Sequence, residues 1–104
     1  MNRSDRVAQL KLLLAAEPDD VFLKYALALE FAKTNDVHQA VLLLEEIRSA
    51  DPLYKAVYYQ LGMLYNALNE TGKAREAVEQ GLAVTKNTDQ KTHNELRGLL
   101  DEIE

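Results

Sequence analysis

The sequence predicts an all-α protein: a stack of antiparallel helix pairs with about six helices. Three observations carry this prediction. Apolar residues recur at the three- and four-residue spacings of a helix face through most of the chain. The same small and apolar residues return after 34 residues, which is the period of a helix–turn–helix repeat. Only two prolines and four glycines interrupt the 104 residues, and the absence of tryptophan leaves burial mainly to aliphatic side chains.

The repeat is clearest between residues 55 and 86. Its marker residues are Tyr58, Leu61, Gly62, Tyr65, Ala74, Val78 and Gly81. The matching residues of the preceding copy are Leu27, Ala28, Phe31, Ala40 and Leu44, with Pro52 at its end. In such a unit small residues allow two helices to approach closely, while large ones fill the space around the crossing. We therefore expect Gly62 to lie opposite Ala74 at a close helix crossing.

This pattern resembles the tetratricopeptide repeat, whose markers are Trp, Leu-Gly, Tyr, Ala, Phe and Pro at a period of 34 residues. The resemblance covers two full repeats; the second has Tyr58 for Trp, Val78 for Phe and Lys86 for Pro. It implies a right-handed α-solenoid in a single domain over residues 1–104. The parts of that domain would be a leading helix (1–18), repeat 1 (19–52), repeat 2 (53–86) and a C-terminal capping helix (87–104).

The first three helices are expected at Arg3–Ala16, Val21–Lys33 and Val37–Ala50. The leading helix carries an apolar stripe of Val7, Leu10, Leu13 and Leu14. Pro18 ends this helix because the residue before a proline avoids the helical conformation. Asp19 and Asp20 then stand where a side-chain acceptor caps the second helix, and Asp36 stands at the same place before the third.

The second half repeats this order, with helices expected at 53–68 and 71–85 and a break around Asn69. One terminal helix follows, and its apolar stripe consists of Leu96, Leu99, Leu100 and Ile103. Its other face is polar, as the end of a helical stack requires. The sequence therefore predicts that this helix covers the end of the second repeat.

The composition limits the classes of function. An apolar content of 47% with 28% charged residues is typical of a globular domain. The sequence has no cysteine, no apolar leader and no run near the roughly 18 residues that cross a bilayer, so we predict a cytoplasmic protein without a membrane partner. Twelve Lys and Arg against 17 Asp and Glu leave a net charge of −5, which opposes nucleic acid binding.

Residues suited to catalysis or metal binding are sparse. His38 and His93 have no second His or Cys at the spacing of metal ligands. The carboxylates of Glu45 and Glu46 point about 100° apart on a helix, which does not suit paired acid–base chemistry. No glycine-rich phosphate loop is present. We therefore predict no enzyme, no metal and no cofactor.

A binding surface is predicted on the side of each first helix that faces away from its partner helix. The residues at these positions are Phe22, Tyr25, Leu29, Ala32 and Lys33 in the first repeat, and Ala56, Tyr59, Met63, Asn66 and Ala67 in the second. The resemblance implies a concave groove that binds a protein or peptide. We predict apolar and aromatic contacts from Phe22, Tyr25, Leu29, Tyr59 and Met63, with Asn66 and Lys91 as polar anchors.

The sequence leaves open two alternatives to an exposed binding surface. Neighbouring helices in so short a stack would hide these side chains if they pressed on one another. The same surface, or the leading helix, would instead pair with a second copy in a structural or assembly protein. We expect a monomer or a weak homodimer.

The resemblance also bears on the kind of ligand. One subgroup of the family binds the terminal carboxylate of chaperone tails with a clamp of basic and amide residues. Of the five clamp positions, three are occupied here by Tyr25, Leu29 and Gln60 and a fourth by Glu95. Lys91 is the one match, and it requires a one-residue insertion before the last helix. We therefore expect a ligand held by apolar and aromatic contacts.

Overall fold

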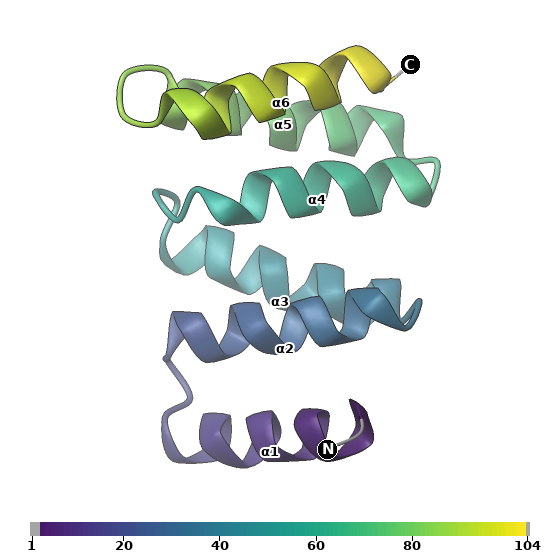
Figure 1. Ribbon diagram of the computed structural model, residues 1–104, viewed down its shortest axis with the longest axis vertical. Helices are drawn as coiled ribbons and strands as arrows, with labels where there is room; N and C mark the ends of the chain where they lie inside the picture. The colour runs from purple at the N-terminus through teal and green to yellow at the C-terminus, as the bar shows by residue number, and fades with distance from the viewer. Residues whose placement is uncertain (1–2, 104) are drawn as a thin grey trace. The chain divides into compact units, whose positions relative to one another are not determined.

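The structure, a computed structural model, describes residues 3–103, which form six α-helices and no β-strand (Figure 1). The helices are α1 (Arg3–Ala16), α2 (Val21–Lys33), α3 (Val37–Ala50), α4 (Ala56–Ala67), α5 (Thr71–Thr85) and α6 (Gln90–Glu102). The predicted all-α fold with six helices is confirmed. The chain forms two compact units, residues 1–47 and residues 48–104.

The start of α4 differs from the prediction, which placed it at Leu53. Instead, a turn precedes the helix: the Tyr54 amide donates to the Asp51 carbonyl at 3.0 Å, and the Leu53 amide donates to the Asp51 carboxylate at 3.2 Å. The Tyr58 hydroxyl donates to the Pro52 carbonyl and holds this turn against α4. The helix therefore begins later, at Ala56.

The two helix turns that end α2 and α4 share one backbone device. Asn35 and Asn69 adopt left-handed conformations, with φ of 63° and 61°. In both turns the amide after the asparagine donates to the carbonyl of the aromatic residue four positions before the asparagine, at 2.9 Å. Such a bond satisfies a free carbonyl at a helix end, and asparagine tolerates the left-handed region better than most residues. The sequence repeat is thus also a repeat of backbone geometry.

Gly62 sets the distance between α4 and the two helices beside it. A Cβ atom on Gly62 would lie 2.5 Å from Val78 Cγ2 on α5 and 2.9 Å from Leu99 Cδ2 on α6. The expectation of Ala74 opposite Gly62 was wrong, because Val78, one turn further along α5, fills this place. The glycine receives a large side chain rather than facing another small one.

Gly81 on α5 holds the reciprocal position. A Cβ atom there would lie 2.5 Å from Tyr58 Cβ on α4 and 2.9 Å from Leu96 Cδ1 on α6. Tyr58 and Leu96 are fully buried. Each of the two glycines therefore accepts side chains from both neighbouring helices, and α6 packs on α4 and α5 together (Figure 1).

Replacing Gly62 by leucine should reduce the stability of the fold by more than about 3 kcal/mol, which is the upper limit of the usual cost of overpacking. The side chain would have to displace Val78 and Leu99, and the helices would have to move apart. Thermal unfolding followed by circular dichroism measures this. Gly72→Leu is the control, because a Cβ atom at Gly72 meets nothing within 4 Å. Equal melting of the two variants would contradict the packing described here.

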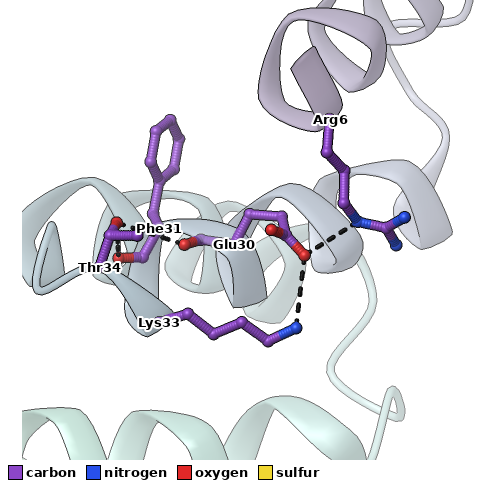
Figure 2. A network of polar contacts seen from close by, with 5 residues as sticks. All are labelled: Arg6, Glu30, Phe31, Lys33 and Thr34. Carbon is purple, nitrogen blue, oxygen red and sulfur yellow. Dashed lines mark hydrogen bonds and ion pairs between the residues drawn. The ribbon is translucent and has the colours of Figure 1, made fainter. Parts of the chain in front are cut away.

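In residues 1–47, a buried carboxylate ties α1 to α2. Figure 2 shows the Glu30 carboxylate between Arg6 of α1 and Lys33 of α2, with Oε2 at 2.9 Å from Arg6 Nε and 3.5 Å from Lys33 Nζ. Lys11 adds a cation–π contact, its Nζ 5.8 Å from the centre of the Phe31 ring.

The apolar stripe of α1 is narrower than predicted. Leu10 is buried at 8% exposure, and Val7 and Leu14 are half-buried. Leu13, expected in the same stripe, is 47% exposed and lies at its edge. Contact with α2 therefore rests on a few apolar side chains together with the charged contacts of Glu30 and Lys11.

The Glu30 carboxylate makes this contact pH-dependent. Burial raises the pKa of Glu30, but hydrogen bonds from Arg6 and Lys33 and their positive charges together outweigh it and leave the pKa below its ordinary value. A lowered pKa in the folded state stabilises the fold above the ordinary pKa of glutamate, about 4.3, and this stabilisation is lost as the pH falls through the lowered value.

We predict that the wild type loses stability between about pH 5 and pH 3 and that Glu30→Gln loses less over the same interval. The reason is that glutamine neither gains nor loses a proton. Urea unfolding of both proteins across this interval measures the difference. Parallel pH profiles would show that Glu30 contributes nothing to the acid sensitivity.

Candidate functional site

Three predicted contact residues lie on one side of α2. Phe22, Tyr25 and Leu29 follow each other at spacings of three and four residues, which places them on one helix face. Phe22 is 70% exposed, while Tyr25 and Leu29 are half-buried. Leu27, on the opposite side, is buried at 5% exposure. The Phe22 side chain is thus available to a partner, while Tyr25 and Leu29 are partly covered.

The start of α2 fixes the direction of this face. Asp20 is the N-cap, and its carboxylate accepts a hydrogen bond from the Leu23 amide at 3.0 Å, as the sequence predicted. Lys24 reaches Glu46 of α3, with Nζ 3.6 Å from Oε1. These contacts fix the rotation of α2 about its axis and leave Phe22 outward.

A second surface lies on α4, in the unit of residues 48–104. Tyr59, Met63 and Asn66 share one face at spacings of four and three residues. Met63 is 39% exposed, and Tyr59 and Asn66 are half-buried. The twelve residues of α4, AVYYQLGMLYNA, include no Asp, Glu, Lys or Arg. This face therefore offers an aromatic ring, a thioether and an amide, without charge.

Lys91, the last predicted anchor, is the second residue of α6 and is exposed. The N-cap Asp89 accepts from the Thr92 amide at 3.0 Å and from its hydroxyl at 2.7 Å, and these bonds lower the pKa of Asp89. Lys55, just before α4, approaches the same carboxylate at 4.0 Å. Local hydrogen bonds thus fix the start of α6 and the place of Lys91.

The two histidines considered for catalysis or metal binding lie apart from any cluster of reactive side chains among the described residues. His38 is exposed on α3. His93 Nδ1 lies 3.2 Å from the hydroxyl of the fully buried Thr85, and this hydroxyl donates to the Gly81 carbonyl at 2.8 Å. Residues 3–103 enclose no pocket and gather no group of three His, Asp or Glu that could hold a metal ion.

Two polar residues, Glu30 and Thr85, are buried although the sequence pattern did not predict it. Both stand among apolar residues on helix faces that pack inward, which is the signal that would have found them. Three exposed leucines also lie outside the predicted surface and outside the predicted stripe of α1. These are Leu12 at 73%, Leu42 at 59% and Leu53 at 71% exposure. Across the described part of the chain, none of the helices has both the length and the apolar character to cross a bilayer.

Comparison with known proteins identifies the family. No protein-family model matches the chain. A tetratricopeptide repeat domain protein from Salinibacter ruber, known from its solution structure, superposes with a TM-score of 0.78 at 37% identity, over 83% of this chain and 88% of that one. This chain belongs to the tetratricopeptide repeat (TPR) family. The resemblance stated from the sequence is confirmed.

Two further relatives of this TPR protein are known by sequence. A TPR repeat-containing protein of Pseudomonas aeruginosa is 32% identical over 74 residues, which are 71% of this chain and 70% of that protein. Anaphase-promoting complex subunit 3 of Dictyostelium discoideum is 27% identical over 99 residues, 95% of this chain. The chain spans only 10% of the length of that subunit. TPR domains are in general protein–protein interaction modules.

Proposed function

We propose that this TPR protein binds a peptide or protein segment through exposed aromatic and apolar side chains and catalyses no reaction. The observation that supports this proposal most is the face of α4, which has no charged residue yet leaves Met63 39% exposed. Apolar side chains left open to water gain free energy when a partner covers them, about 25 cal/mol for each Å² buried. A surface of this kind suits binding better than solvation.

The proposed contact residues differ in how much of each side chain is exposed to a partner. On α2 they are Phe22, Tyr25 and Leu29; on α4 they are Tyr59, Met63 and Asn66; on α6 the anchor is Lys91. Phe22 and Met63 are the most exposed of the apolar contact residues, while the two tyrosines are half-buried. Aromatic side chains of this kind often dominate binding energy. The concave groove and the cytoplasmic location remain predictions.

The charge pattern argues against a ligand held mainly by its carboxylate. Tyr25 and Leu29 stand where the chaperone-tail clamp has charged or amide groups, and Lys24 and Lys33 already contact Glu46 and Glu30. Lys91 alone would leave a terminal carboxylate with one charged contact. We therefore propose a ligand bound chiefly by apolar contact.

Selection of a random peptide display library on the immobilised chain, followed by titration of one synthetic selected peptide, tests the proposal. Phe22→Ala and Tyr59→Ala should each weaken binding of that peptide by about 1–3 kcal/mol, because each removes a ring from the contact. Phe22→Ala should leave the melting temperature almost unchanged, since the ring is 70% exposed.

Glu79→Ala, on the exposed part of α5, is the matched control and should bind the peptide as the wild type does. A peptide that tolerates both ring removals but not Glu79→Ala would place binding on the other side of the helix pair. If no peptide is selected, the proposed function is wrong.

Self-association is the second candidate, and the exposed face of α1 favours it. Leu12 is 73% exposed and shares its side of the helix with the exposed Ala8, Ala15 and Ala16. If assembly is the function, sedimentation velocity should show a dimer that Leu12→Lys converts to a monomer. A wild type that sediments as a monomer at high concentration would exclude this candidate.

A further inference from the structure

Gly98 lies in the middle of α6, and the packing of the chain gives no reason for a glycine there. A Cβ atom at Gly98 would meet nothing within 4 Å, whereas one at Gly62 or Gly81 would collide at 2.5 Å. Glycine inside a helix is unfavourable relative to alanine because it loses more backbone freedom on folding. Gly98 therefore costs stability without improving an internal contact.

Aligned on their N-caps, α2 and α6 place Gly98 at the position of Leu29, one of the proposed contact residues; relative to the 34-residue period this alignment includes one inserted residue before α6. Asp20 and Asp89 are equivalent N-caps, since each accepts from the amide three residues later at 3.0 Å. Leu29 lies nine residues after Asp20, and Gly98 lies nine residues after Asp89. Met63 holds the same place in α4, one repeat of 34 residues after Leu29. Where α2 and α4 present an apolar side chain, α6 presents bare backbone.

The rest of this face of α6 is polar. Lys91, Asn94 and Asp101 lie seven and four residues before Gly98 and three residues after it, so they share its side of the helix. All three are exposed. The opposite side carries Leu96 and Leu99, which pack on α5 and α4. A partner that crosses α6 at Gly98 would thus touch the backbone and find hydrogen-bonding and charged groups on either side.

We infer that the main chain of the bound peptide crosses α6 at Gly98 and that the part of the peptide over α4 carries no charge. The inference rests on the proposed function and names its ligand class. It uses helices α4 and α6 of one unit, which contact each other. A glycine is the residue that lets another backbone approach most closely.

The absence of charged residues from α4 favours a peptide whose segment over α4 is uncharged. A charged residue over α4 would lose hydration without gaining a counter-charge, because α4 has none. Over α6, Lys91 and Asp101 can each pair with a charge of the peptide. The ligand class is therefore a peptide with an uncharged segment beside α4 followed by polar or charged residues that reach α6.

The test uses the full chain and a synthetic peptide taken from the display selection. Gly98→Ala should raise the melting temperature by about 4 °C, since alanine favours the helix, and yet weaken peptide binding about tenfold, since the methyl group holds the peptide backbone away. Gly72→Ala is the matched control: its added methyl group also meets nothing within 4 Å, and peptide binding should not change.

The outcomes separate this inference from the proposed function. Gly98→Ala with unchanged affinity would overturn the crossing at Gly98, while loss of binding in Phe22→Ala or Tyr59→Ala would still support the proposed function. If the selected peptides share a charged central segment, the inference that the part of the peptide over α4 is uncharged is wrong. A second substitution, Met63→Glu, should shift the selection toward basic peptides if the ligand lies over α4; an unchanged selection would place it elsewhere. Failure to select any peptide would overturn both proposals.

Discussion

In the unit of residues 48–104, the packing of three helices depends on the missing side chains of Gly62 and Gly81. Helices usually pack with axes about 8–10 Å apart, and the distance follows the side chains at the contact. Here Val78 and Tyr58 occupy the space that a methyl group would need, and Leu99 and Leu96 close the same two spaces from α6. The three helices are therefore interdependent, because each glycine serves two contacts at once.

This inward packing determines what faces outward. With Gly62 and Leu61 directed into the unit, the helical rotation of about 100° per residue turns Tyr59 and Met63 away from it. In α6 the N-cap Asp89 fixes the first turn of the helix, and this determines the direction in which Gly98 faces. The proposed binding surface is thus the complement of the core: the core residues decide which side chains remain available.

The sequence predicted the features that depend on local spacing. Helix boundaries, the Asp20 cap and the faces of α2 and α4 follow from periodicity and from side chains within a few residues. The partner of Gly62 and the Arg6–Glu30 ion pair depend on residues that the fold brings together, and a period cannot specify these. The late start of α4 is local, but it is set by the hydrogen bonds of the turn at Asp51 and Pro52, which periodicity does not describe. For the same reason the sequence identified outward positions but could not tell that Phe22 is far more exposed than Tyr25.

The strength of the Arg6–Glu30 ion pair depends on the ionic strength of the solution. Arg6 is a largely exposed side chain, at 56%, so dissolved ions can reach its guanidinium and weaken its attraction to the carboxylate. The glycine-centred packing of residues 48–104 involves no charge and gains no such sensitivity. Salt therefore weakens the charged contacts of this small protein, such as Arg6–Glu30 and Lys55–Asp89, while it leaves the apolar contacts around Gly62 and Gly81 almost untouched.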